Sequence, residues 1–200
     1  EAMHTREHVG YNAQLDEQGY RATTLHLHLR KHLSFLRSKF GAKRQLAVTC
    51  ALEHFTALFA DQIMSDPRYM EGADETYKKV WLWHAVEEAE HKGVAFNAYQ
   101  AAFKGKGYFM RVRVMILATI IFNYFIFKHI RWMLSDRGML FSPKAWVKVL
   151  WYTMGRPGIF RRIFLPWPAY FKPGFHPWDH DNRKKLGEVQ TQLLGQSAHA

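Results

Sequence analysis

The sequence predicts an all-α fold, and three observations lead to this prediction. Long stretches of the chain lack proline and contain few β-branched residues, which favours helix over strand. Within these stretches, chemically related side chains recur three and four positions apart, as they do on one face of a helix. The stretches end at Gly19, Gly41 and Asp66-Pro67, which are typical helix-ending signals. The 200 residues and the 48% hydrophobic content suit one domain with its own core.

Four helices are expected in the first half of the chain. Their predicted bounds are residues 1–18, 21–40, 43–65 and 73–103. The second stretch contains an alternating segment, Leu25 to Leu29, which could also suggest a strand. Its length and its Lys/Arg-rich C-terminal half favour a helix, because basic residues interact well with the C-terminal end of the helix dipole. The segment 104–107, in which Lys and Gly alternate, is the sharpest boundary in the sequence.

The second half of the chain is apolar and basic. Residues 101–174 contain thirteen Lys and Arg against one acidic residue, Asp136, so this segment holds all the excess of the +11 net charge. The run from Val114 to Phe127 is almost continuously apolar, but its fourteen residues fall short of the roughly twenty that span a bilayer. It is expected either to be buried in the core or against a partner, or to lie in a membrane interface. Further helices are expected from Pro143 to Met154 and from Asn182 to Leu194, with a proline-rich strap from Tyr170 to Asp181 between them.

Two copies of a Glu-x-x-His motif lie on predicted helices. Glu1 and His4 form one copy, and Glu88 and His91 form the other. Helices with this spacing bind a pair of metal ions in ferritin-like bundles, where the carboxylate can bridge two metals and the imidazole binds one of them. A lone Glu53, on a helical face with small neighbours, supplies the carboxylate of a third helix. Such sites use four carboxylates and the fourth is not evident, so we expect the site to be incomplete or distorted.

The candidate site residues follow from these helical faces. His84 and Glu87 share the stripe of Glu88 and His91, and His8 lies one turn beyond His4. We expect two divalent metal ions, with iron first and zinc or manganese as alternatives, because carboxylate and imidazole ligands suit these metals. The expected metal ligands are Glu1, His4, His8, Glu53, Glu88 and His91, and the expected catalytic residues are Glu87 and His84.

Other histidine-rich patterns give competing interpretations. The segment from His4 to His8 matches the His-x-x-Glu-His pattern of inverted zinc peptidases, in which Glu7 would be the base. A second group, on the helix 21–40, has no carboxylate beside it; it consists of His26, His28 and His32. In the strap, His176, Asp179, His180 and Asp181 could form an accessory polar or metal cluster. Asp179 or Asp181 could equally cap the last helix.

Several classes of function lack support in the sequence. There is no Gly-x-Ser-x-Gly motif and no glycine-rich phosphate loop, and the single cysteine, Cys50, lies in an apolar run. One cysteine also excludes an intramolecular disulfide framework and fits a reducing compartment. Nucleic-acid binding is disfavoured because the basic residues flank a long apolar run, which favours lipid or an apolar substrate.

Taken together, the motifs resemble those of a bacterial family of predicted metal-dependent hydrolases. The resemblance covers residues 1–185 and is most specific in the block from His84 to His91. It rests on the N-terminal Glu-x-x-His-x-x-x-His, on Glu53 before His54, on Trp-x-Trp-His-x-x-Glu-Glu-x-Glu-His-Lys and on Pro-Gly-Phe-His-Pro-Trp. It implies a ferritin-like helical bundle that binds metal through Glu1, His4, Glu53, Glu88 and His91, with His8 and His84 close by. It also implies a further N-terminal helix with a carboxylate; since this chain has no initiator Met and Glu1 lies in a helix already under way, we expect that region to be missing upstream.

The expected architecture and function follow from these patterns and this resemblance. Residues 1–103 form the metal-binding helical bundle, and residues 104–200 form a C-terminal helical, apolar and basic extension that packs on the bundle as one domain. The expected function is that of a metal-dependent hydrolase with a small apolar or lipid-like substrate. The alternatives are a di-iron oxygenase or oxidase acting on an apolar substrate, and a non-catalytic, metal-binding bundle at a membrane. We expect a cytoplasmic protein at the inner face of the membrane, peripherally associated with it, able to form homo-oligomers and without nucleic-acid partners.

Overall fold

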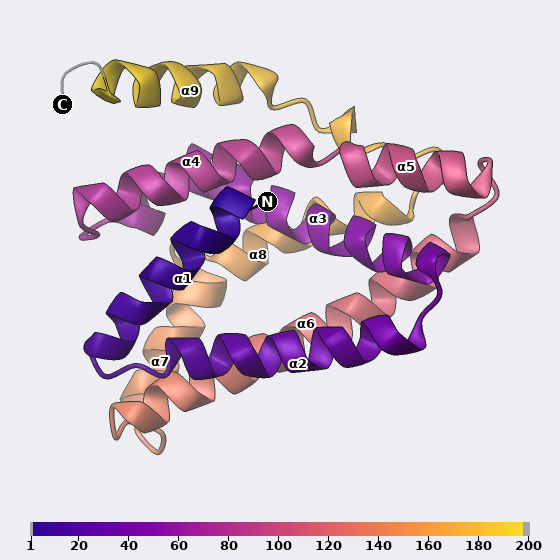
Figure 1. Cartoon of the computed structure of the whole chain (residues 1–200). Coiled ribbons are helices and arrows are strands. Elements are labelled where there is room, and N and C mark those ends of the chain that lie inside the picture. The colour runs from indigo at the N-terminus through magenta and orange to yellow at the C-terminus, as the bar shows by residue number, and fades with distance from the viewer. Residues whose placement is uncertain (1, 198–200) are drawn as a thin grey trace.

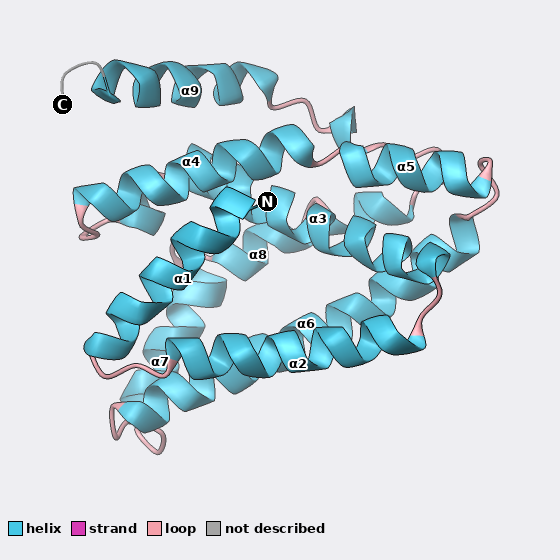
Figure 2. Cartoon of the chain, viewed as in Figure 1, coloured by secondary structure: helices cyan, strands magenta, loops and turns pink. Residues whose placement is uncertain are grey.

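The computed structural model describes residues 2–197 of the chain and the side chains of residues 5–195. The structure is 81% helical and residues 2–197 contain no strand, which confirms the all-α fold class (Figures 1 and 2). The α-helices are α1 (Ala2–Glu17), α2 (Ala22–Lys39), α3 (Ala42–Ser65), α4 (Glu75–His91), α5 (Val94–Phe103), α6 (Tyr108–Asp136), α7 (Pro143–Leu150), α8 (Ile159–Phe164) and α9 (Arg183–Ser197). Short helical turns lie at Pro67–Met70 (η1), Trp151–Gly155 (η2), Trp167–Phe171 (η3) and Pro177–Asp179 (η4).

Helix α3 is the centre of the structure. It packs against α4, α5, α6, α8 and α9, so helices from both halves of the chain meet on it. Small side chains make these close approaches sterically feasible, because they keep the helix surface near its own backbone. The buried small residues of α3 are Ala47, Cys50, Ala51, Ala57 and Ala60. Helix α3 is therefore the element on which the neighbouring helices are positioned.

A buried arginine joins α6 to the C-terminal strap. The side chain of Arg111 is only 3% exposed, and it donates a hydrogen bond of 2.8 Å to the carbonyl oxygen of Lys172. Its guanidinium lies 5.1–5.6 Å from the centres of four aromatic rings, which belong to Phe96, Tyr108, Tyr170 and Phe175. Cation–π attraction is strengthened when the cation is desolvated. The strap is thus held on the bundle by a cation inside an aromatic cage.

The predicted helix 73–103 is wrong in one respect, since it is two helices. Helix α4 ends at His91 and α5 begins at Val94. A Cβ atom at Gly93 would lie 2.7 Å from Nε1 of Trp178, so only glycine allows the strap to approach here. Beside it, Nζ of Lys92 donates hydrogen bonds of 2.8 Å to the carbonyl oxygen of His180 and to Oδ1 of Asn182. The helix is interrupted where the strap docks.

The apolar run from Val114 to Phe127 is the middle of a much longer helix than the run alone indicates. Helix α6 has 29 residues, and by length and composition it is the one helix in residues 2–197 able to cross a membrane. Only 17% of its most apolar window is buried, so most residues of this segment are at least partly exposed. Asn123 is exposed, and its Nδ2 donates a hydrogen bond of 2.8 Å to the carbonyl oxygen of Thr119.

The regions after α6 follow the predicted order with small differences. The expected helix from Pro143 to Met154 continues as far as Leu150 and then becomes the π-helical turn η2. The strap is not fully extended, because the turns η3 and η4 interrupt it. Asp181 lies just before α9, and its Oδ1 accepts a hydrogen bond of 3.1 Å from the backbone N–H of Arg183. This contact has the geometry expected of a carboxylate at a helix start.

Asp66 ties the end of α3 to α8. Its buried carboxylate accepts hydrogen bonds from the backbone N–H and the guanidinium of Arg68, and Nη1 of Arg162 lies 2.9 Å from Oδ2. The side-chain hydrogen bonds from Arg68 are the main cause that lowers the pKa of Asp66 to about 2, and the charges of Arg68 and Arg162 add to them. The carboxylate is therefore ionised in the folded protein at neutral pH.

Replacing Asp66 by Asn should lower the free energy of unfolding by about 2 kcal/mol at pH 7, because the negative charge that strengthens the contacts with Arg68 and Arg162 is lost. The folded pKa is below the unfolded value, so this contribution is present above about pH 4 and is lost as the pH falls toward 2. Urea unfolding of the wild type and the variant at pH 7 and at pH 2.5 measures both effects. Glu71→Gln, at an exposed neighbouring residue, is the control; equal losses at both pH values would contradict the assignment.

Candidate metal centre

Helix α4 presents the predicted stripe of metal-binding side chains. Its start is capped by Asp74, whose side chain accepts a hydrogen bond of 2.8 Å from the backbone N–H of Thr76. From this start, residues three and four apart place His84, Glu88 and His91 on one side of the helix. Nε2 of His84 lies 3.5 Å from Oε1 of Glu88, and their side chains are 18% and 16% exposed. This pair is thus largely withdrawn from solvent.

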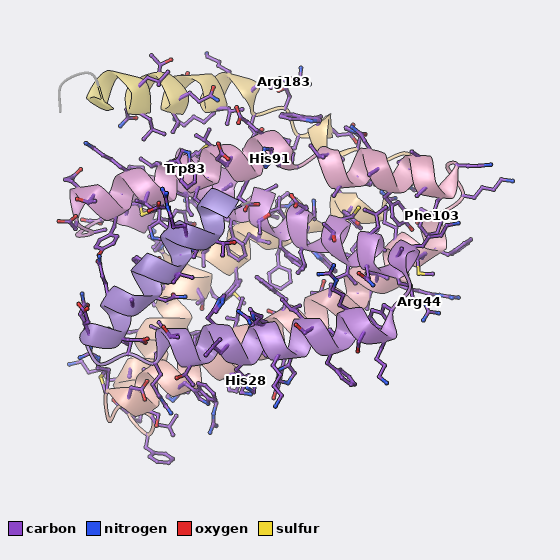
Figure 3. The ribbon with its side chains drawn as sticks, viewed as in Figure 1. His28, Arg44, Trp83, His91, Phe103 and Arg183 are labelled. Atoms are coloured by element: carbon purple, nitrogen blue, oxygen red, sulfur yellow. The ribbon has the colours of Figure 1, made fainter. Side chains whose placement is uncertain are left out.

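Helix α1 brings His8 to the same stripe. The ring centres of His8 and His84 are 4.8 Å apart with the rings nearly perpendicular, and the ring of Trp81 lies 5.6 Å from that of His8. One turn along α1, the rings of Tyr11 and Tyr77 are 5.2 Å apart. The N-terminal end of α1 approaches α4 in Figure 1, and Figure 3 shows Trp83 and His91 on α4. His84 therefore contacts both His8 of α1 and Glu88 of its own helix.

Glu53 and His54 lie on different faces of α3. Glu53 is half-buried on the helix that packs along α4. His54 is buried against the rings of Tyr170 and Phe175, with ring centres 4.9 and 5.5 Å away. Burial lowers the pKa of His54 to about 4, so its imidazole is neutral at physiological pH. His54 is accordingly part of the core beneath the strap.

The predicted ligand set is only partly represented. Glu1 and the side chain of His4 lie outside the described residues. Among the side chains that are described, no group of three or more His, Cys, Asp or Glu could hold a metal ion. Glu87 and His91 are half-buried on α4, but with Glu53, Glu88 and His84 they do not form one coordination sphere. The donor chemistry nevertheless fits a metal, because half-buried imidazoles and carboxylates face each other between α1 and α4.

A cleft adjoins the His8–His84 contact. A small cavity there is lined by Glu7, His8, Tyr11, Trp81, Trp83 and His84, among others. Tyr11 and Trp81 also line a larger cleft of about 560 Å³ between α1, α4 and η2. Three more aromatic side chains line this larger cleft, namely Tyr69, Tyr77 and Tyr152. These lining residues were not predicted, because their convergence depends on how α1 crosses α4 and no local motif records it.

The competing histidine clusters have other partners. Nε2 of His28 lies 2.5 Å from Nζ of Lys128, and Nδ1 of His32 lies 2.8 Å from the carbonyl oxygen of His28. In the strap, Nδ1 of His176 accepts a hydrogen bond from the backbone N–H of Trp178. Nε2 of His180 lies 3.3 Å from Oδ2 of Asp61 on α3. These contacts join helices and cap turns, so four of these histidines have structural partners within the protein.

The sequence matches one family of known proteins. A family model described as "predicted metal-dependent hydrolase" matches residues 1–181. No curated protein and no solved structure matches the chain. The family model covers most of the chain, including every residue of the α1, α3 and α4 stripes described above. The chain belongs to this predicted metal-dependent hydrolase family.

Proposed function

We propose that the chain is a metal-dependent hydrolase whose centre lies between α1, α3 and α4. The observation that carries the proposal is the meeting of His8 on α1 with the His84–Glu88 pair on α4, in a half-buried site of imidazole and carboxylate groups. Family membership supports the same chemistry. Two divalent ions, iron first with zinc or manganese as alternatives, would be held by Glu1, His4, His8, Glu53, Glu88 and His91.

Two side chains of helix α4 are suited to general acid–base catalysis beside such a centre. When His84 takes up a proton, the carboxylate of Glu88 at 3.5 Å stabilises the imidazolium, so His84 can hold a proton for a leaving group. Glu87, one residue before Glu88 and half-buried, is proposed to accept a proton from water. A bound divalent metal would supply a lowered water pKa and polarisation of a carbonyl oxygen.

The cleft suggests what class of substrate reaches this centre. Its aromatic side chains, among them Tyr11, Tyr77 and Trp81, offer apolar faces with a few polar tips. Such a lining favours a small apolar or lipid-like molecule over a highly charged one. We propose that this cleft admits the substrate, with the reactive bond placed at the His84 end.

We further propose that the protein lies on a membrane surface through α6, α7, η2 and α8. Large apolar side chains on these elements and on the segments that adjoin them are exposed, and they include Ile120, Phe127, Phe141, Leu150, Trp151, Phe164 and Leu165. Helix α7 packs beside α6, with the rings of Phe127 and Trp146 5.8 Å apart. Eight of the thirteen Lys and Arg of residues 101–174 lie on α6, α7 and α8. Apolar side chains beside basic residues match the boundary between acyl chains and anionic headgroups.

Replacing Glu88 by Gln should reduce bound metal by at least about half, since a bridging carboxylate serves both ions. Elemental analysis of the full-length protein after loading with Fe(II), Zn(II) or Mn(II) measures the stoichiometry. Glu90→Gln is the matched control on the same helix, because an amide there can still accept the hydrogen bond of 2.6 Å from Gln190. Equal metal content in all three proteins would remove Glu88 from the ligand set.

Replacing Glu87 by Gln should lower the rate of hydrolysis of activated esters by about 100-fold or more while leaving metal content unchanged, because a general base is lost but no ligand is. Ester hydrolysis by the metal-loaded enzyme, with and without dioxygen, is the measurement. A rate independent of dioxygen supports a hydrolase. Dioxygen consumption with an apolar substrate would instead favour the di-iron oxygenase, and metal binding without either activity would favour a non-catalytic bundle.

The protein should bind vesicles that contain anionic phospholipid more tightly than neutral vesicles, and salt should weaken this binding because it screens the headgroup charge. Co-sedimentation at low and high salt measures it. Trp151→Ser and Leu165→Ser should each weaken binding, since they remove exposed apolar area. Val94→Ser removes a similarly exposed apolar side chain from α5 and is the matched control. Equal binding to neutral and anionic vesicles would contradict the electrostatic part of the proposal.

A further inference from the structure

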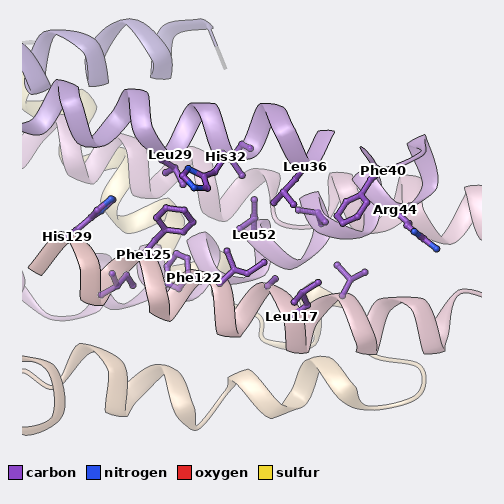
Figure 4. Close-up of a pocket in the computed structure, with 16 residues that line it drawn as sticks. Leu29, His32, Leu36, Phe40, Arg44, Leu52, Leu117, Phe122, Phe125 and His129 are labelled. Atoms are coloured by element: carbon purple, nitrogen blue, oxygen red, sulfur yellow. The ribbon is translucent and has the colours of Figure 1, made fainter. Parts of the chain in front are cut away.

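A second cavity lies away from the candidate metal centre, between α2, α3 and α6. Its volume is about 290 Å³, and apolar side chains form most of its wall (Figure 4). They include Leu29, Leu36, Leu52, Leu117, Phe122 and Phe125. Apolar cavities of this kind do not hold water well, and smaller engineered ones bind benzene. The cavity is therefore suited to a hydrocarbon ligand.

Helix α2 forms one wall of this cavity but is not closely packed against the core. None of its residues is buried, although Leu29, Leu33 and Leu36 face the cavity at helical spacing. Leu33 remains 41% exposed. An amphipathic helix normally buries such a stripe against the core, so the apolar surface of α2 is left incompletely covered. A ligand between α2 and α6 would cover it.

The two ends of the cavity carry nitrogen-rich side chains (Figure 4). Arg44 lies at one end, where it is exposed to solvent. His32 and His129 lie at the other end, and within residues 2–197 no hydrogen-bond partner reaches the buried Nε2 atom of His129. Burial is the main cause that lowers the pKa of His129, so its imidazole is neutral and one ring nitrogen can donate.

The surroundings of the histidine end favour an anion. The ammonium group of Lys128 contacts His28 and lies 5.2 Å from the centre of the Trp132 ring, and the rings of His28 and His32 are 4.4 Å apart. Helix α2 contains no acidic residue, and the one acidic residue of α6, Asp136, is paired with Arg21 at 2.6 Å. At this end the two helices therefore present histidine donors and the Lys128 cation, and neither helix supplies a carboxylate there that would neutralise the cation.

We propose that this cavity binds a long-chain carboxylate, with the hydrocarbon chain between α2, α3 and α6 and the carboxylate at the His32–His129 end. The length agrees, because the wall from Leu29 to Phe40 extends for about 16 Å at 1.5 Å per residue. The site is separate from the proposed metal centre, since Leu52 lines the cavity while Glu53 projects about 100° further round α3. Its occupancy therefore does not depend on the hydrolase proposal.

The test is binding of laurate and of lauryl alcohol to the full-length protein, measured by calorimetry without added metal and below the micelle concentration. Laurate should bind with micromolar affinity and more tightly than the alcohol, which has the same chain but no charge. Ala118→Phe fills the cavity and should weaken laurate binding by about tenfold or more. Ala102→Phe, at an exposed residue of α5, is the matched control and should bind as the wild type does.

His129→Leu tests the carboxylate end separately from the cavity. It keeps an apolar wall but removes the donor, so the preference for laurate over the alcohol should fall by roughly fivefold. His26→Leu, on α2 but outside the cavity lining, should keep the preference. Absence of laurate binding, or equal laurate affinity in the wild type and the Ala118→Phe variant, would overturn the proposal.

Photo-crosslinking keeps the proposal testable even if a cavity variant fails to fold. Laurate with a diazirine at its terminal carbon should label peptides within 29–52 or 114–129 of the wild-type protein, whereas labelling confined to 141–165 would place the chain on the exposed surface and overturn the proposal. Two sources of ligand are compared: free laurate, and phosphatidylglycerol vesicles. If unlabelled laurate prevents the labelling, the site binds a free carboxylate. If only the vesicles prevent it, the labelling reflects adsorption to lipid and the proposal is overturned.

Discussion

The close packing of α3 is the constraint on which the rest of the structure depends. Its buried alanines and Cys50 let helices from both halves of the chain lie close against it. Helix α3 packs along α4, while its Leu52 faces the cavity beside α2 and α6. One helix therefore separates a polar site from an apolar one. Enlarging any of the buried alanines would move both sites, because core helices cannot shift independently.

The C-terminal strap stabilises this arrangement from outside the bundle. Arg111 on α6 lies inside its aromatic cage, and Lys92, in the break between α4 and α5, lies beside Trp178; both form contacts with the strap. His180 and Asp61 add an ion pair between the strap and α3, and the hydrogen bond that the His180 ring donates to the Asp61 carboxylate raises the pKa of His180. The raised folded pKa means that this pair stabilises the fold below about pH 6.5 and that its contribution is lost as the pH rises through that folded pKa. The strap thus fixes the point where α4 gives way to α5, one turn from the candidate metal ligands.

Much of the helical architecture was predictable, because helix-ending residues are local signals. Gly19, Gly41 and Asp66-Pro67 end α1, α2 and α3 close to the predicted bounds. The break at Gly93 was not predictable, since its cause is Trp178, which is distant in the sequence. The extent of α6 was missed because its ends are amphipathic and only its centre is continuously apolar. For the site, helical spacing placed His84 beside Glu88 and the N-terminal motif placed His8 nearby, whereas the aromatic cleft and the cavity beside α2 arise from tertiary packing.

We propose above that α1, α3 and α4 assemble a metal centre. Anomalous diffraction from crystals of the full-length protein loaded with zinc or iron tests it most directly, because the metal is located without reference to any assumed ligand. The account predicts anomalous peaks between α1, α3 and α4, within coordination distance of about 2.0–2.2 Å of Glu88 and at least one histidine of the set His4, His8, His84 and His91. Peaks only at the His26–His32 cluster of α2, or only at His176 and His180 of the strap, would contradict it.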